Sequence, residues 1–186
     1  MRIAPLIVGS VALIAVVIGC GTEATAPDEL GVVNDELKVR VNGPWVVYAD
    51  PFLDGGVNPL ANITGRLLVR TPRQEQTTTV SALLFGLPRN TAFVAHAHLL
   101  ACADNKAGGH YQNSADAGAN PQNELWLNIN AQPFFDYEQS VAFTHSTVDW
   151  RFRPDSGHAV VVHSTVALPD GGTKAGAKLA CVDVPF

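Results

Sequence analysis

Short runs rich in β-branched and aromatic residues recur from residue 37 to the end of the chain, and Gly, Pro, Asn and Asp separate them. Apolar and polar side chains alternate within these runs, most clearly at 77–85 and 125–129, as expected of strands with one buried face. After residue 30 no segment repeats its apolar residues at helical spacing. The pattern predicts nine strands, at 37–41, 45–48, 63–70, 77–85, 92–98, 124–130, 140–152, 158–163 and 178–184.

Turn-forming sequences such as Pro-Asp-Ser-Gly and Pro-Asp-Gly-Gly join several of these runs. The composition, 47% hydrophobic and 16% charged, fits one globular domain with a sizeable core. We therefore expect an all-β domain over residues 37–186, a Greek-key sandwich or barrel of about eight antiparallel strands. Residues 101–123 and 170–177 are predicted to be long irregular segments. A long loop in a compact domain is typically functional.

The first 19 residues are typical of a targeting segment. Arg2 is followed by an uncharged run of 18 residues ending at Cys20, close to the length of a membrane span. The run ends in Val17-Ile18-Gly19-Cys20, which resembles the lipobox of bacterial lipoproteins, where the chain is cut before a cysteine that is acylated. We expect a signal peptide over 1–19, a lipid on Cys20 and a location in the cell envelope outside the cytoplasm. A retained single transmembrane segment is the alternative.

Residues 20–36 are small, polar and acidic, as expected of a tether between a lipid and a folded domain. With Cys20 assigned to the membrane, two of the three cysteines remain, Cys102 and Cys181. An even pair in an oxidising compartment favours a disulfide, worth roughly 4–5 kcal/mol in the chain-entropy description. Two separate buried thiols are the alternative.

The charge pattern excludes one class of partner. The net charge is −5, and Lys and Arg form no run, which argues against nucleic acid as a partner. Removal of residues 1–19 would take one arginine and no acid, so the domain would become more acidic. An anionic ligand would therefore have to be attracted by local positive charge.

Four of the six histidines form a pattern that suits a metal site. His96 and His98 lie two apart in an apolar run, so both imidazoles face one side of the predicted strand. Such a pair commonly supplies two nitrogen ligands to a transition metal, although two surface imidazoles would show the same spacing. His110 follows in the long loop and His163 ends another apolar run. Spacing alone leaves their convergence open.

These histidines belong to a longer pattern. The sequences GLPRNT at 86–91, HAH at 96–98, Cys102 and GGH at 108–110 resemble the copper/zinc superoxide dismutase family in order and spacing. Toward the C-terminus, GHAVVVH at 157–163 and GAKLAC at 176–181 are similar to a histidine-bearing strand and a Gly-x-Arg-Leu-Ala-Cys segment of that family. The resemblance covers residues 62–186.

The resemblance implies a disulfide that ties the metal-bearing loop to the last strand, Cys102–Cys181. It also implies a copper site whose ligands are His96, His98, His110 and His163. Cu(II) would oxidise one superoxide anion to oxygen, and Cu(I) would reduce a second to hydrogen peroxide. His110, in the position of the family's bridging imidazole, would release from Cu(I) and carry a proton.

The chain departs from the family where zinc would bind. The family places two further histidines and an aspartate after the bridging one, but no histidine lies between His110 and His145. Asp116, Asn123 and Glu124 remain, and they make a poor zinc site beside one shared imidazole. We therefore expect no structural zinc, as in the copper-only branch, where a carboxylate orients the imidazole. Glu124 is the candidate; an exposed acid at a strand end is the alternative.

A second departure is Lys178, which stands where the family carries arginine beside copper. Lysine keeps the positive charge that guides an anion but lacks the planar fork of donors. A third is the short region 140–158, which leaves little room for the family's charged guiding loop. We expect copper-dependent superoxide dismutation at the envelope, with His110 and Lys178 as catalytic residues. The alternative is a copper-binding, dismutase-like lipoprotein without efficient turnover. His145 and His158 match no ligand position and are expected to be structural or exposed.

Overall fold

The computed structural model of the chain describes residues 36–49, 58–72, 75–133, 140–153, 156–167, 173–184 and 186. The expected signal peptide, Cys20 and the tether up to residue 35 lie outside these residues. Within the part that is described, no helix is long and apolar enough to cross a membrane.

The described residues form ten strands and one short 3₁₀ helix, η1 (Asn105–Ala107). The strands are β1 (Glu36–Val41), β2 (Val46–Val47), β3 (Thr64–Pro72), β4 (Thr78–Leu87), β5 (Ala92–His98), β6 (Trp126–Asn130), β7 (Gln132–Pro133), β8 (Ser140–Val148), β9 (Ala159–Ala167) and β10 (Thr173–Asp183).

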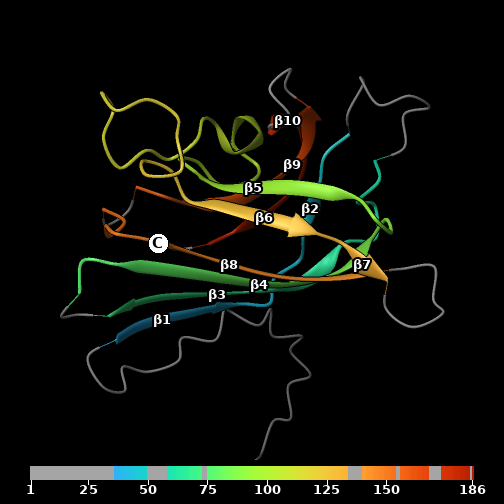
Figure 1. Cartoon of the computed structure of the whole chain (residues 1–186), viewed down its shortest axis with the longest axis horizontal. Coiled ribbons are helices and arrows are strands. Elements are labelled where there is room, and N and C mark those ends of the chain that lie inside the picture. Colours follow the sequence, from blue (N-terminus) through green and yellow to red (C-terminus); the bar gives the residue numbers. More distant parts are fainter. Residues whose placement is uncertain are drawn as a thin grey trace, which may run out of the picture.

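Two antiparallel sheets of five strands each are stacked as the layers of a sandwich (Figure 1). One sheet has the order β1-β3-β4-β8-β7, and the other has the order β2-β10-β9-β5-β6. Strands β4 and β8 are hydrogen-bonded neighbours in the first sheet. In the sequence between them, the chain crosses to the other sheet, forms β5 and β6 there, and returns to form β7. The prediction of an all-β sandwich is confirmed.

Burial along the strands shows which side chains fill the space between the sheets. In β4, Val80, Ala82 and Leu84 are buried and alternate with partly exposed residues, as expected of a sheet with one covered face. Strand β5 is different, because every residue from Phe93 to His98 is buried. The odd-numbered residues of this run join the main core, so His96 and His98 point to the outer face of the sheet.

The strand bounds differ from the predictions in a few places. Glu36, expected in the tether, begins β1 by pairing with Pro72 of β3. Strand β8 ends at Val148 rather than at residue 152, and Trp150 instead donates its indole N–H to the carbonyl of Gln122. Residues 173–177, expected to be irregular, belong to β10, where pairing with β9 forms the strand despite a weak apolar pattern. Strand β7, an exposed two-residue edge, was not predicted.

Candidate metal centre

Neighbouring strands bring three histidines to the outer face of the second sheet. His96 and His98 lie on β5, and His163 lies on β9 opposite Val94 of β5. The residue before His163 on β9 explains its direction, since Val162 joins the main core and His163 therefore faces the other way. All three histidines are buried.

The long loop after β5 folds back and brings the fourth histidine. His110 forms an isolated bridge with His98, and the backbone N–H of Tyr111 donates to the carbonyl of Ala97 at 2.8 Å. Gly108 suits the turn, because its φ of +64° strains other residues and a Cβ there would lie 2.9 Å from the side chain of Leu100, which would have to move. The local turn therefore places His110 over the end of β5.

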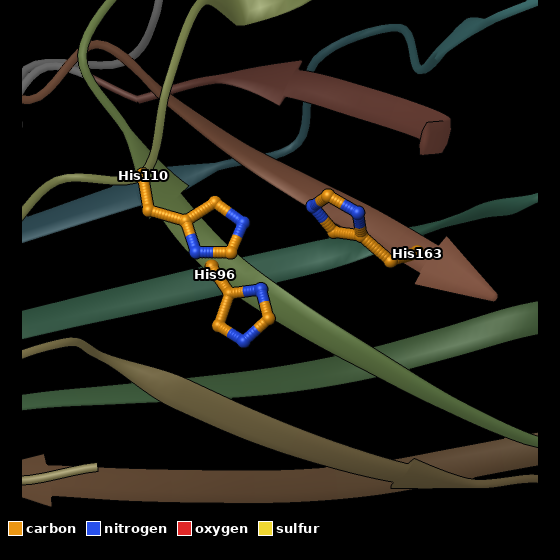
Figure 2. Close-up of side chains that lie close together, drawn as sticks. All are labelled: His96, His110 and His163. Carbon is orange, nitrogen blue, oxygen red and sulfur yellow. The ribbon is translucent and has the colours of Figure 1, made fainter. Parts of the chain in front are cut away.

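Three imidazoles converge on one point (Figure 2). One ligand atom from each of His96, His110 and His163 lies within 4.8 Å of the other two. The ring centroids of His96 and His110 are 4.3 Å apart, and each lies 5.3 Å from that of His163. Because neutral imidazole nitrogens are ligands for transition metals, these three side chains could hold a metal ion.

His98 joins the group through His163. Its Nε2 lies 3.1 Å from the Nε2 of His163. The Nδ1 of His98 lies 3.1 Å from the carbonyl of Gly108, and the Nδ1 of His163 lies 3.1 Å from the carbonyl of Gly176. A carbonyl only accepts hydrogen bonds, so both rings carry the proton on Nδ1 and leave Nε2 as a bare acceptor.

Burial keeps these imidazoles neutral near pH 7. Burial first, and then the neighbouring imidazoles, lowers the pKa of His96 from 6.5 to about 2. Burial is also the largest cause for His98, whose pKa falls to about 3, and for His163, whose pKa falls to about 4. His96 has no hydrogen-bond partner on either buried nitrogen among the described residues. His96, His98 and His163 therefore present uncharged nitrogen donors.

Glu124 anchors the outer nitrogen of His110. Its Oε2 accepts from His110 Nδ1 at 3.1 Å and from Trp126 Nε1 at 2.9 Å, and its Oε1 accepts from Gln112 Nε2 at 3.1 Å. The carboxylate is 1% exposed, so these three N–H groups replace the water it loses. Because His110 carries its proton on Nδ1, its Nε2 is left for a metal.

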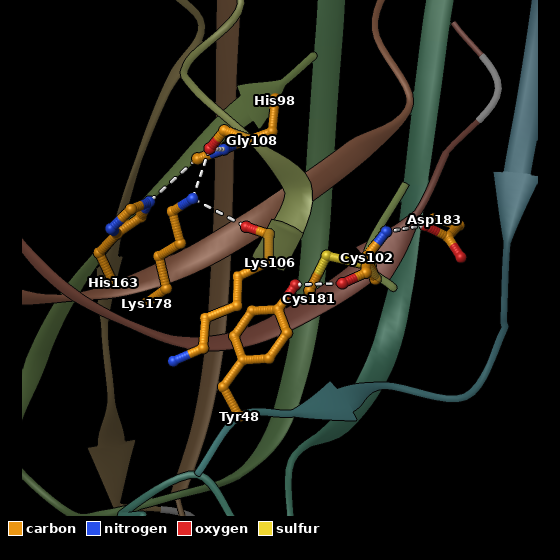
Figure 3. Close-up of a disulfide and its surroundings, with 9 residues drawn as sticks. All are labelled: Tyr48, His98, Cys102, Lys106, Gly108, His163, Lys178, Cys181 and Asp183. Carbon is orange, nitrogen blue, oxygen red and sulfur yellow. Dashed lines mark hydrogen bonds between the residues drawn. A yellow bond between two sulfur atoms is a disulfide. The ribbon is translucent and has the colours of Figure 1, made fainter. Parts of the chain in front are cut away.

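Lys178 lies beside the cluster on β10, opposite His163 in the strand register (Figure 3). Its Nζ donates to the carbonyl of Lys106 at 2.8 Å and to that of Gly108. The Gly108 carbonyl also accepts from His98, so the cation and a candidate ligand share one acceptor. Burial and the nearby Lys106 lower the pKa of Lys178 below its ordinary 10.5.

A disulfide joins the start of the loop to β10 (Figure 3). It links Cys102 to Cys181, 79 residues apart in the sequence. The Tyr48 hydroxyl donates to the carbonyl of Cys102 at 2.9 Å, and Asp183 Oδ1 accepts from the Cys102 N–H at 2.6 Å. Burial, and then Asp183, raises the pKa of Tyr48 to about 12. Three contacts thus fix the loop where it leaves β5.

The side chains of the remaining candidates do not belong to the three-histidine group. His145 is exposed on β8, and His158 is half-buried and pairs through its backbone with His98 and Val184. Asp116 is exposed in the loop. Asn123 is buried, and its side chain bonds to the backbone of Ser114 and Gly118.

Two residues of the site were missed from the sequence. Neither Trp126 nor Gln112 is among the candidate site residues named from the sequence. A signal was present for both, because Trp126 lies two residues after Glu124 and Gln112 two residues after His110. In extended chain that spacing places side chains on one face.

A comparison with protein-family models and with curated protein sequences finds no match to this chain.

Proposed function

We propose that the chain is a superoxide dismutase in which one copper ion is held by His96, His98, His110 and His163. The observation that carries the proposal is the convergence of His96, His110 and His163, together with the bare Nε2 of His98, which faces that of His163 at 3.1 Å. Facing lone pairs repel, so a cation between them would relieve the repulsion. The pattern shared with the copper/zinc superoxide dismutase family supports copper.

The donor set suits copper. All four candidate ligands are imidazoles, which bind copper, zinc, iron and nickel, and Cu(II) binds most tightly among these divalent ions. The outer nitrogen of His110 is bonded to Glu124, which itself receives two further N–H donors. This arrangement supports the proposal of a single copper site over a shared copper and zinc pair.

Copper would supply the alternating one-electron oxidation and reduction that superoxide dismutation needs. The protein's own part is to hold charge and protons beside it. Lys178 keeps a positive charge next to His98 and His163, where it would attract an anion. Glu124 holds the proton of His110 on Nδ1, so Nε2 is the nitrogen that binds the metal or, once free, accepts a proton.

The test is to load the purified protein with copper and to measure superoxide consumption against the same amount of free copper. We expect one copper per chain and activity well above free copper. His96→Ala should lose both, whereas His145→Ala, at an exposed histidine outside the cluster, should keep both. A fully loaded protein no faster than free copper would rule out the enzyme.

A second candidate, a copper-holding protein without efficient turnover, is favoured by the contacts of Lys178. Its ammonium group donates to two backbone carbonyls, which limits its freedom to meet an anion. This candidate requires tight copper binding that His96→Ala abolishes, together with negligible dismutation. The same two assays therefore distinguish the candidates.

We further propose that Cys20 carries a lipid that holds the domain in the cell envelope, because the sequence before it resembles a lipobox. Labelled fatty acid should be incorporated into the wild-type chain expressed in a bacterium and not into Cys20→Ser. Equal labelling of both chains would contradict the proposal.

A further inference from the structure

We propose that Trp126 is a positioning residue of the metal centre, because its indole N–H holds Glu124 against His110 and its ring packs on His96. The proposal rests on the proposed metal site and extends it to a residue that binds no metal itself.

The first support is the sharing of one carboxylate oxygen. Oε2 of Glu124 accepts from Trp126 Nε1 at 2.9 Å and from His110 Nδ1 at 3.1 Å. Without the indole, the carboxylate would be held only by His110 on Oε2 and Gln112 on Oε1, and both of these donors lie in the loop after β5. The indole N–H belongs to a rigid ring on β6, so it limits where Oε2 can lie. The direction of the His110 ring then follows from that oxygen.

The second support is the strand register. Trp126 on β6 pairs directly with His96 on β5. Their ring centroids lie 4.8 Å apart at an interplanar angle of 77°, an edge-to-face contact. Among the described residues the two ring nitrogens of His96 have no hydrogen-bond partner, so packing holds its ring. Trp126 touches this ring on one side and His110 stacks on another.

Trp126 therefore connects two candidate ligands that come from different elements. His96 is placed by a strand, whereas His110 is placed by a loop. The indole fixes His110 relative to the sheet through Glu124 and fixes His96 by contact. Its loss should leave the ligands present but less well oriented, so the metal should bind more weakly in a changed geometry.

The decisive variant is Trp126→Phe, which keeps an aromatic ring and removes the N–H. We expect 10–100-fold weaker copper binding, the range found when groups that orient metal ligands are removed. The Cu(II) paramagnetic resonance spectrum should also change. Trp150→Phe is the matched control, because it too removes an indole N–H bond, made at 2.9 Å to the carbonyl of Gln122, while its ring contacts are with Tyr111 and Phe152 rather than with a candidate ligand. It should leave affinity and spectrum unchanged.

Wild-type affinity and an unchanged spectrum in Trp126→Phe would overturn the proposal. If wild-type protein bound no copper, the proposed function would fail. The contact between Trp126 and Glu124 would then be tested in metal-free protein by the hydrogen-exchange rate of the indole N–H. Glu124→Leu should speed exchange of the Trp126 N–H at least tenfold and leave that of Trp150 unchanged. An unaffected Trp126 rate would show that Glu124 does not hold it.

Discussion

His98 and His163 point their Nε2 atoms at each other across 3.1 Å, while each ring donates its Nδ1 proton to a backbone carbonyl. The two carbonyls fix the tautomers, so the facing atoms both carry lone pairs. The rings come from strands that pair side by side, and neither strand can withdraw without breaking the sheet. The fold therefore imposes a repulsive contact that a bound cation would turn into an attractive one.

Metal binding should therefore stabilise the fold. Cu(II) at a free concentration a hundredfold above its dissociation constant should raise the free energy of unfolding by about 2.7 kcal/mol, and a chelator should reverse the gain. His163→Ala should lose this response, while His145→Ala should keep it. Thermal denaturation with and without metal measures both. An equal gain in His163→Ala would contradict a site at this cluster.

The metal-free protein should lose stability in mild acid. His96, His98 and His163 have pKa values lowered to about 2, 3 and 4, so below 6.5 the unfolded chain binds protons that the folded chain does not. Stability is then full above pH 6.5 and falls as the pH drops toward 4, because each proton that only the unfolded chain binds lowers the free energy of unfolding. Denaturant unfolding from pH 7 to pH 4 measures the slope. His98→Gln should reduce it, and a slope that is unchanged in this variant would contradict the assignment.

Loss of charge at Glu124 should weaken the site. In Glu124→Gln a neutral amide replaces the carboxylate that accepts from His110, Trp126 and Gln112, so the hydrogen bond that holds the His110 ring loses its charge assistance and weakens. We expect metal affinity to fall 10–100-fold, as measured by competition with a chelating dye. Glu75→Gln is the control, because Glu75 is exposed and its side chain bonds to Thr77. An equal loss of metal affinity in Glu124→Gln and Glu75→Gln would show that the loss of any negative charge weakens binding, and that the contact with His110 is not the cause.

The disulfide should contribute strongly to stability. It closes a segment with a sequence separation of 79 residues, for which the chain-entropy description gives about 4.5 kcal/mol. Cys102→Ser with Cys181→Ser should lower the free energy of unfolding by an amount of this order. Tyr48→Phe, which removes the hydrogen bond to Cys102, should cost only about 1 kcal/mol. Denaturant unfolding compares the two, and a larger loss in Tyr48→Phe would reverse the expected order.

If the chain dismutates superoxide, Lys178 should set the dependence of its rate on salt. Lys178→Met removes the positive charge beside His98 and should lower the rate at low ionic strength most, since screening weakens long-range attraction. Lys178→Arg should keep the salt dependence. Rates measured from low to high salt test this. A wild-type rate in Lys178→Met at low salt would remove the residue from the proposed mechanism.

The strands were largely predictable because burial on one face leaves a period of two in the sequence. Strand β5 was predicted instead from a short apolar run, and its bounds match the predicted 92–98; the two-residue spacing of His96 and His98 placed both on one side. The start of β10 was not predictable in the same way. Its first residues form a strand through pairing with β9, and their own side chains carry no clear apolar pattern.

The sequence by itself determined the all-β class and the faces of the strands, because these depend on neighbours within a few residues. It also supplied four histidines in an ordered pattern, though not their convergence. Only the tertiary structure decided that His98 meets His163, 65 residues away, and that Trp126 and Gln112 join Glu124 around His110. Such contacts depend on which strands pair and where a loop folds back, and these follow from packing of the whole domain.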